Sequence, residues 1–570
     1  MSKEQNNHAY NKRRLMLLLL FIVVVALLMW RVVYLQVFNK GFLQGQGTAR
    51  HLRTVSIPAH RGVIMDRHGD ALAISTPVES IWVNPKKLVD QRQVLPELAS
   101  LLKLDLDSLE QTIASRMNRE FVYLKRHVNP DLAEKVLALE AEGVFSQREY
   151  RRYYPAGEVV SHVIGFTNID DKGQEGIELA YENWLKGSAG KKRVIKDRLG
   201  RVIEDVENIE SPHPGKDLHL SIDRRIQYLA YRELKTAIKV NGARSGSAVM
   251  LDVDTGEVLA IVNQPSYNPN KRTKLRGSQY RNRAVTDVFE PGSTIKPFTI
   301  ATALESKQYN PATRINTSPG YMKVGRNTIR DHKNYGEIDV TRVITKSSNV
   351  GASKIALSLE AEQIWSMFTR LGFGNVTASG FPGESAGLMS HYSRWHQIER
   401  ATLSFGYGLS VTPMQLAHAY SILASGGISR PVSFIRADGE VAGEQVVSAS
   451  VAAQVRKMMQ TVISSEGTGL RASVYGYKVA GKTGTIHKST AGGYADNRYI
   501  AVFAGMAPAS NPRLVLVVMV NDPSGEQYYG GQVAAPVFSK VMSGALRLMD
   551  ITPDDLPVIQ TQLQNGKGRS

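Results

Sequence analysis

The stretch Phe289–Pro297 reads FEPGSTIKP, and it is the segment that most strongly indicates the fold and chemistry of this chain. Pro291 and Gly292 end any preceding element, so a helix is expected to begin at Ser293. Residues three apart lie on one helix face, which places the Lys296 amine within reach of the Ser293 hydroxyl. Free backbone N–H groups at a helix N-terminus favour the anion that develops in acyl transfer. The stretch therefore predicts a serine nucleophile.

The pattern Ser-x-x-Lys is a weak signal by itself, because this chain contains it three times. Ser100 and Lys103 lie in Leu-rich helical sequence, and Ser188 and Lys191 lie in a Gly-rich loop. We interpret both of these pairs as chance matches, so the choice of Ser293 depends on other motifs.

Two further motifs follow Ser293 in the same domain. Ser347-Ser348-Asn349 precedes a helical stretch of small residues, and Lys482-Thr483-Gly484-Thr485 is a Lys-Thr-Gly sequence that occurs once. A second Ser-x-Asn, Ser266-Tyr267-Asn268, lies between prolines in a predicted loop. Three motifs in this order are typical of serine acyltransferases that act on penicillin-like substrates.

Composition and charge exclude several classes of protein. A chain of 570 residues is too long for one hydrophobic core. With 42% hydrophobic and 21% charged residues, it is neither a polytopic membrane protein nor largely disordered. The absence of cysteine excludes disulfides, thiolate metal sites and cysteine nucleophiles. The net charge of +18 includes no dense basic run with aromatics, so a solvated basic surface is expected and nucleic acid is not.

An apolar segment near the N-terminus predicts a membrane anchor. Leu15–Trp30 contains no charged residue, and after Arg31 the apolar sequence continues to about Val37. Lys12, Arg13 and Arg14 precede it, so residues 1–14 are expected in the cytoplasm and the rest is exported. A cleaved signal peptide is the alternative, but no small-x-small site follows. We predict one transmembrane helix over residues 15–37.

The exported part divides into two predicted domains and a tail. Residues 41–217 contain β-like runs and helical spacing over 94–109 and 130–142, without a cluster of catalytic groups. A Pro- and Gly-containing linker near residues 211–215 sets the boundary. Residues 218–556 form the second domain, and residues 557–570 are predicted to be a disordered tail.

The second domain is predicted to be α+β, with a sheet that joins strands distant in sequence. The predicted elements are a strand over 218–222, an amphipathic helix over 224–240, a hairpin of 247–253 and 257–262 around Asp254-Thr255-Gly256, a buried strand over 514–520 and a helix over 533–549.

With these motifs the chain resembles the superfamily of β-lactamases and penicillin-binding proteins, and within it the class B penicillin-binding proteins. Arg61–Arg67 (RGVIMDR) and Arg151–Pro155 (RRYYP) are similar to signatures of the non-catalytic pedestal of that class. Asp287–Ser293, Lys346–Gly351 and Phe405–Leu409 resemble the division-specific, FtsI-type group. An elongation-type relative is the alternative, but such relatives usually carry Asp where this chain has Asn349.

The resemblance implies a β-lactamase-like serine acyltransferase domain that follows an elongated pedestal domain. It implies a D,D-transpeptidase that crosslinks peptidoglycan stem peptides at the division septum through an acyl-enzyme on Ser293, with release of D-alanine. β-Lactams would be covalent inhibitors, and no cofactor or metal is implied. The implied partners are D-Ala-D-Ala stem peptides, an FtsW-type glycosyltransferase and other divisome proteins, at the inner membrane with the catalytic domain in the periplasm.

The roles of the site residues combine side-chain chemistry with the resemblance. Lys296 acts as base only when neutral, so burial and the neighbouring cation of Lys482 must lower its pKa. Ser347 is expected to relay a proton, and Asn349 to orient the lysine. The substrate-binding residues are expected to be the N–H groups of Ser293 and Thr485, the carboxylate-binding motif Lys482, Thr483, Gly484 and Thr485, and the walls Tyr407, Tyr528 and Tyr529. The three tyrosines could equally be ordinary core or surface aromatics.

Two other functions stay open at this point. A β-lactamase or antibiotic sensor would need a carboxylate that activates water, and Glu360 and Glu362 are the candidates in sequence, although a solvated helix face explains them. An anchored scaffold with a vestigial catalytic domain is the other alternative, against which the three intact motifs argue.

Overall fold

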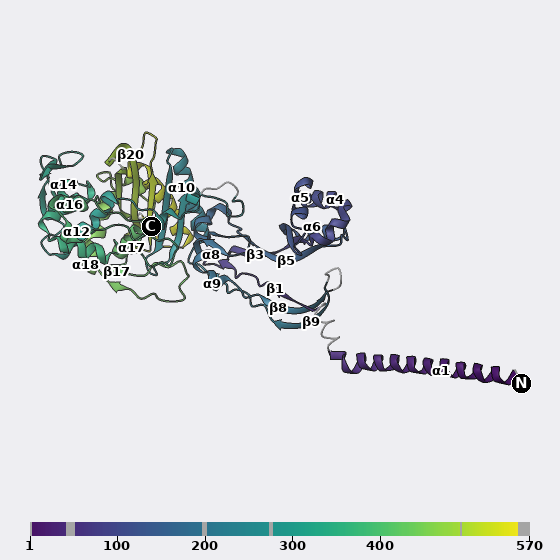
Figure 1. Cartoon of the computed structure of the whole chain (residues 1–570). Coiled ribbons are helices and arrows are strands. Elements are labelled where there is room, and N and C mark those ends of the chain that lie inside the picture. The colour runs from purple at the N-terminus through teal and green to yellow at the C-terminus, as the bar shows by residue number, and fades with distance from the viewer. Residues whose placement is uncertain (1–2, 42–51, 197–201, 273–276, 491–492, 557–570) are drawn as a thin grey trace, which may run out of the picture. The chain divides into compact units, whose positions relative to one another are not determined.

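A computed structural model of the chain describes residues 3–41, 52–196, 202–272, 277–490 and 493–556 (Figure 1). The predicted tail 557–570 lies outside the described residues. The chain divides into two compact units, each built from several segments. The first unit comprises residues 1–60, 77–150 and 187–214, and the second comprises residues 61–76, 151–186 and 215–570. Segments 61–76 and 151–186, which we assign to the first domain from sequence, therefore belong to the unit that holds the three motifs.

The first unit begins with a long apolar helix. Helix α1 (Lys3–Val33) continues as a π-helical turn, η1 (Tyr34–Phe38). In the described part of the chain, Asn11–Phe38 is the one helical stretch long and apolar enough to cross a membrane. The predicted span 15–37 lies within it.

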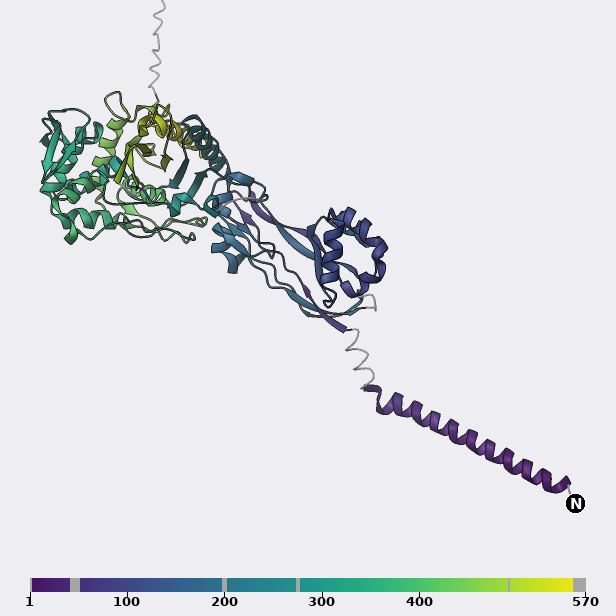
Figure 2. The same cartoon turned by 45° about the horizontal axis from the view of Figure 1, so that its top comes forward.

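The rest of the first unit has a small α/β core and a three-stranded sheet. Helices α4 (Leu95–Leu102), α5 (Leu106–Ser115) and α6 (Pro130–Leu137) cluster together in both views (Figures 1 and 2) and share a core with strands β3 (Ala71–Val83), β4 (Val122–Val128) and β5 (Val144–Tyr153). Helices α3 (Pro85–Leu88) and η2 (Val89–Val94) precede α4. The separate sheet has the order β1 (Leu52–Ile57), β8 (Gly190–Lys196), β9 (Val202–Glu210).

Both helical predictions in this region need correction. The spacing over 94–109 is not one helix, because Lys103 adopts a left-handed conformation (φ 51°) that ends α4. The Asp105 carboxylate then accepts a hydrogen bond from Ser108 N and starts α5. The stretch over 130–142 is helical only as far as Leu137.

A five-stranded antiparallel sheet forms the centre of the second unit. Its order is β12 (Val258–Gln264), β11 (Ser245–Asp252), β21 (Leu514–Asn521), β20 (Gly493–Ala507), β19 (Ala480–Thr490). The predicted hairpin and the predicted strand over 514–520 are confirmed. The sheet also joins strands more than 200 residues apart, as predicted for an α+β domain.

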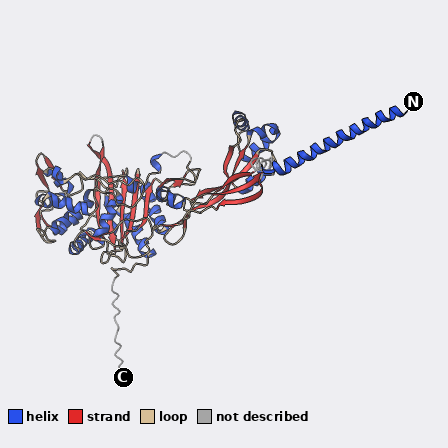
Figure 3. Cartoon of the chain, turned by 60° about the horizontal axis from the view of Figure 1, so that its bottom comes forward, coloured by secondary structure: helices blue, strands red, loops and turns tan. Residues whose placement is uncertain are grey.

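Both faces of this sheet are buried, which explains its continuous apolar runs. Along β11, Val249 and Leu251 point to one core, whereas Ala248 and Met250 point to the other. Helices α10 (Arg224–Val240) and α20 (Ala535–Leu548) contribute to the core on one face, and α12 (Lys296–Glu305) and α17 (Pro413–Ala424) contribute to the core on the other face. Figure 3 shows helices around the strands of this unit. The predicted helix 224–240 is confirmed, and the predicted helix 533–549 begins two residues later than expected.

Shorter elements surround the sheet. The predicted strand 218–222 is limited to β10 (Leu218–His219), after which Leu220 forms an isolated bridge with Ile435. The other elements of the unit are β2 (Ile64–Met65), η3 (Gly157–Val159), α7 (Ser161–Ile164), β6 (Phe166–Thr167), β7 (Gly173–Glu175), α8 (Gly176–Ala180), α9 (Glu182–Leu185), η4 (Gly277–Gln279), α11 (Arg283–Thr286), η5 (Gly292–Ile295), β13 (Arg314–Asn316), β14 (Tyr321–Val324), β15 (Asn327–Arg330), β16 (Glu337–Asp339), α13 (Val340–Thr345), α14 (Asn349–Ser358), α15 (Ala361–Arg370), η6 (Tyr392–Arg394), α16 (Gln397–Leu403), β17 (Ile428–Ser429), β18 (Glu444–Gln445), α18 (Ala449–Gln460), η7 (Thr461–Ile463), η8 (Leu470–Ala472) and α19 (Gly530–Val533).

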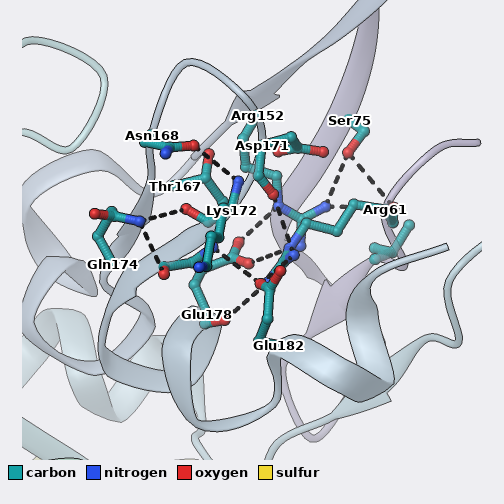
Figure 4. Close-up of polar contacts among 12 residues, drawn as sticks. Arg61, Ser75, Arg152, Thr167, Asn168, Asp171, Lys172, Gln174, Glu178 and Glu182 are labelled. Carbon is teal, nitrogen blue, oxygen red and sulfur yellow. Dashed lines mark hydrogen bonds and ion pairs between the residues drawn. The ribbon is translucent and has the colours of Figure 1, made fainter. Parts of the chain in front are cut away.

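A buried charged cluster in the second unit explains the two arginine-rich signatures (Figure 4). Glu178 is fully buried, and its carboxylate accepts hydrogen bonds from Arg61 Nε and Arg152 Nε, each at 2.6 Å. Arg61 also donates to Glu182 Oε2 at 2.6 Å and to the Glu178 carbonyl at 2.7 Å. The cluster therefore joins the segment 61–76 to the segment 151–186 within this unit.

Candidate active site

The three motifs meet at one cleft of about 820 Å³ in the second unit. Eight of the eleven residues predicted for the site line it: Ser293, Ser347, Asn349, Tyr407, Thr483, Thr485, Tyr528 and Tyr529. Lys296 and Lys482 are fully buried and are hydrogen-bonded to Ser347, which lines the cleft. Gly484 lies on β19 between Thr483 and Thr485.

The first motif forms a helical turn against a Gly-rich segment. Residues 292–295 are a 3-10 turn, η5, and the α-helix proper begins at Lys296. Gly292 N donates to Gly406 O at 3.1 Å, and Gly406 has φ +87°. A Cβ on Gly406 would lie 2.1 Å from Gly292 O, so only glycine permits this approach. The half-buried Ser293 is thereby held at the wall of the cleft.

The Lys296 amine makes its hydrogen bonds to the second motif. Lys296 Nζ donates to Asn349 Oδ1 at 2.8 Å, to Ser347 O at 2.5 Å and to Ser347 Oγ at 3.2 Å. Among the hydrogen bonds of the described residues there is none between Ser293 Oγ and Lys296 Nζ, the contact that the spacing makes possible. Without substrate, catalytic hydrogen bonds are commonly long and tighten only when the complex forms.

The Ser347 hydroxyl lies between the two buried lysines. Lys482 Nζ donates to Ser347 Oγ at 2.8 Å, and Lys296 Nζ donates to the same oxygen at 3.2 Å. Ser347 has φ +59°, a left-handed conformation that costs free energy for a residue other than glycine. The lysine contacts and the backbone bond from Lys296 to Ser347 O hold this strained residue in place.

Burial lowers the pKa of both amines, and like charge adds to this effect for Lys296. Burial lowers the pKa of Lys482 to about 7. Burial, together with the positive charge of Lys482, lowers the pKa of Lys296 well below its usual range, whereas the carboxylate of Asp331 acts in the opposite direction. A neutral amine that can accept a proton is therefore available near neutral pH, as a general base requires.

The third motif lies on β19, at the edge of the sheet. Lys482 pairs with Ala504 and Thr485 with Ala501 in the antiparallel ladder with β20. Alternate residues of a strand point to opposite faces, so Thr483 and Thr485 both point to the cleft, which they line. The Thr485 hydroxyl accepts a hydrogen bond from Gly530 N at 2.9 Å, which fixes its orientation.

The three predicted tyrosines lie in two groups. Tyr528 stacks on Tyr529 with ring centroids 4.5 Å apart, and also on Tyr499 at 4.1 Å, to give an aromatic wall of the cleft. Tyr407 lines another part and packs edge-on against Tyr494. All three predicted tyrosines therefore line the cleft, although sequence gave no reason to include Tyr499.

Several cleft residues lie outside the motifs. They are mostly cationic, aromatic or polar: His332, Lys333, Tyr335, Lys346, Ser465, Thr468, Arg471, His487, Tyr499 and Gln532. Only Lys346 could have been found from sequence, because it directly precedes Ser347. The alternative Ser-x-x-Lys pairs are elsewhere: Ser100 is exposed on α4 in the first unit, and the backbone of Ser188 pairs with that of His213.

Comparison with known proteins identifies the family. The penicillin-binding protein dimerisation domain matches residues 56–220, and the penicillin-binding protein transpeptidase domain matches residues 246–543. The chain is 46% identical over 534 residues to peptidoglycan D,D-transpeptidase FtsI of Escherichia coli, covering 93% of this chain and 90% of that protein.

Solved structures agree with this assignment. The transpeptidase domain of Burkholderia pseudomallei penicillin-binding protein 3 is 42% identical, with a TM-score of 0.55, and covers 59% of this chain and 98% of that one. A peptidoglycan synthetase from Bifidobacterium adolescentis is 25% identical, with a TM-score of 0.70, and covers 89% of this chain and 98% of that one. The chain thus belongs to the class B penicillin-binding proteins, and among them to the FtsI-type peptidoglycan D,D-transpeptidases.

Proposed function

We propose that this chain crosslinks peptidoglycan stem peptides during cell division, through an acyl-enzyme on Ser293. The observation that carries the proposal is the composition of the cleft: the three motifs supply a nucleophile and two buried lysines, and none of the described lining residues is Asp or Glu. A cleft of this kind can form an ester but holds no carboxylate to activate water.

In the first step, Ser293 Oγ attacks the carbonyl between the two terminal D-alanines, and neutral Lys296 takes the hydroxyl proton. The N–H groups of Ser293 and Thr485 stabilise the oxyanion, and the loss of one such donor typically costs about 3 kcal/mol. The C–N bond then breaks, and Ser347 passes a proton to the nitrogen, so that free D-alanine leaves. The contacts from Lys296 and Lys482 to Ser347 Oγ support this route.

Substrate binding uses the third motif and the aromatic walls. Lys482, Thr483 and Thr485 receive the terminal carboxylate, and Asn349 contacts the peptide amide. Tyr407 and the stacked Tyr528 and Tyr529 cover the peptide side chains. Cationic lining from Lys333 and Arg471 also favours an anionic peptide.

In the second step, an amine from a neighbouring strand attacks the ester carbonyl, gives its proton to the lysine and serine relay, and releases Ser293 with a new amide bond. A β-lactam follows only the first step, because its ring opens without a leaving group. Glu360 and Glu362 cannot serve as the water-activating base of a β-lactamase, because both are exposed at the start of α15 and neither lines the cleft.

The location and the partners of the chain are part of the same proposal. The apolar N-terminal helix anchors the chain in the inner membrane, and the basic residues before it keep the N-terminus in the cytoplasm. The catalytic domain then lies in the periplasm. An FtsW-type glycosyltransferase and other divisome proteins are the proposed partners, on the basis of the FtsI-type relatives.

The first test is labelling of the full-length, detergent-solubilised protein with a fluorescent penicillin. We expect a label that persists for hours in the wild type and is lost in Ser293→Ala and Lys296→Ala. Ser100→Ala, the same change in a chance Ser-x-x-Lys pair, is the matched control and should label normally. A label that disappears within minutes would indicate a β-lactamase and contradict the proposal.

A cellular test separates enzyme from scaffold. In cells depleted of the native protein, a Ser293→Ala chain should localise and be stable but fail to restore division. Restored division by that variant would show that scaffolding, not crosslinking, is its essential role.

A further inference from the structure

Asp331 lies outside the three motifs but is bound to the second one. It directly follows β15, is half-buried, and precedes the cleft residues His332 and Lys333. Its carboxylate belongs to a loop for which the sequence predicts no role. The sequence did not predict this connection, because Asp331 is distant in sequence from Ser347 and belongs to no motif.

The Asp331 carboxylate accepts three hydrogen bonds from the start of α14. Oδ1 accepts from Asn349 N at 2.5 Å and from Val350 N at 3.0 Å, and Oδ2 accepts from Ser348 Oγ at 2.6 Å. Ser348 Oγ in turn accepts from Gly351 N at 2.9 Å, as the N-cap of the helix. An anion at this position is favoured by the free N–H groups and by the helix dipole.

The same loop also fixes the side chain of Asn349. The Asn349 Nδ2 amide donates to Arg330 O at 3.1 Å, so its Oδ1 is turned to Lys296 Nζ at 2.8 Å. Asn349 therefore connects the Asp331 carboxylate to the buried Lys296 amine. Its backbone N–H binds the carboxylate, and its side-chain oxygen binds the amine.

We propose that Asp331 is a positioning residue of the transpeptidase site, whose carboxylate holds the second motif against Lys296 and partly offsets the positive charge of the buried lysines. This role of Asp331 rests on the proposed function, and it adds to the site an anion that acts on the buried Lys296 amine. Removal of the Asp331 charge should change the pKa of Lys296, whereas removal of the Ser348 cap alone should change only the geometry of the second motif.

The charged groups around Lys296 support this role. Lys482 faces it from β19, and Asp331 is the anion that acts on it from the loop after β15; Ser347 and Asn349 are uncharged. Lys482 lowers the pKa of Lys296 and Asp331 raises it. On the same loop, Asp331 also contributes to a raised pKa of Tyr335, after burial. Lys346 is paired with Glu466 at the surface.

The test is the pH dependence of penicillin acylation in the full-length protein. Asp331→Asn keeps an oxygen that can accept from Asn349 N and Val350 N but removes the charge. In a plot of acylation rate against pH, the acidic limb reports the deprotonation of the base and the plateau reports the maximal rate. Because the loss of an anion lowers the pKa of Lys296, the acidic limb should move to lower pH, while the plateau changes little. A purely structural role would lower the plateau and leave the limb in place.

Two further variants keep the test decisive. Ser348→Ala removes the capping hydroxyl and leaves the charge, so the plateau should fall, by roughly 10- to 100-fold, with the limb unmoved. Asp339→Asn is the matched control, because Asp339 caps the neighbouring helix α13 through Arg342 N at 2.7 Å. Neither limb nor plateau should change in that variant.

Melting temperatures establish that each variant is folded. An unmoved limb in folded Asp331→Asn, or a limb that moves in Ser348→Ala or equally in Asp339→Asn, would overturn the proposal for Asp331. If Asp331→Asn does not fold, Ser348→Ala still tests the proposal, because a moved limb in that variant would overturn it. A wild type that forms no stable adduct would instead overturn the proposed function, and this inference with it.

Discussion

Lys482 Nζ lies 2.8 Å from Ser347 Oγ, so the third motif directly orients the hydroxyl of the second. Lys482 is on β19 of the central sheet, and Ser347 lies in the turn before α14. The contact therefore joins the central sheet to the helical part of the domain. Because Lys296 also donates to the same oxygen, any change at this hydroxyl affects both lysines at once.

Replacement of Ser347 by alanine should slow acylation more than it affects folding. The variant loses the proton relay and one acceptor of each lysine, and proton transfer by a positioned group is typically worth about 100-fold or more. The second-order rate constant with fluorescent penicillin measures the loss. A rate within a few-fold of the wild type would exclude the relay, and an unchanged melting temperature excludes misfolding as the cause.

The stability of the domain should rise as the pH is raised from about 7 towards 10. In the unfolded chain a lysine has a pKa of about 10.4, whereas folding lowers the pKa of Lys482 to about 7. Between these values the unfolded state binds more protons, so the free energy of unfolding increases with pH. Melting temperatures across this range, followed by tryptophan fluorescence, provide the measurement.

The matched variant for that experiment is Lys482→Met, which fills the same buried space without a titrating group. Its melting temperature should depend less on pH over the same range. An equal slope in both proteins would mean that the amine of Lys482 titrates normally when folded.

Loss of the Glu178 carboxylate should destabilise the second unit strongly. Glu178→Gln leaves Arg61 and Arg152 buried with an incomplete partner, and breaking a buried ion pair in this way typically costs about 3–5 kcal/mol. Urea unfolding of the full-length protein in detergent measures the change. Glu182→Gln, at the partly exposed side of the same cluster, should cost less. Equal losses would show that Glu178 is not its centre.

Two glycines in the segment 405–409 form a matched pair for the backbone contact at Ser293. Both have φ near +85°, so alanine is strained by roughly 1–2 kcal/mol at either position. Only at Gly406 would the new Cβ also meet backbone, 2.1 Å from Gly292 O, whereas at Gly408 the space is open. Gly406→Ala should therefore lose penicillin labelling and Gly408→Ala should keep most of it; similar labelling would show that the contact yields easily.

Sequence periodicity predicted those elements whose buried residues follow one regular pattern from end to end. The helix over 224–240 and the strand over 514–520 follow from regular apolar spacing, and both are confirmed. The pattern over 94–109 failed because periodicity does not register one left-handed residue, Lys103, that splits two helices. Nor did it indicate that segments 61–76 and 151–186 join the C-terminal unit, since that depends on the buried pairing of Arg61 and Arg152 with Glu178.

For the active site, sequence indicated the groups that carry motifs and missed those that support them. Ser293, Ser347 and Thr485 are recognisable by spacing, and they line one cleft. Asp331 and Tyr499 are not, because each is an isolated residue whose role comes from a tertiary contact, to Ser348 and to Tyr528 respectively. The residue roles stay predictions, which the variants above test.

The order of strands in the central sheet also determines when the enzyme can begin to work. Strand β21 is translated after β11, β19 and β20, yet it lies between β11 and β20 and pairs with both. Until residue 521 has been synthesised, β11 and β20 therefore present unpaired, apolar edges, which are prone to aggregation. The nucleophile at residue 293 is synthesised long before its sheet can close. Acylation competence is thus acquired in one late step, and a chain truncated ahead of β21 should be degraded by proteases and not act as a weak enzyme.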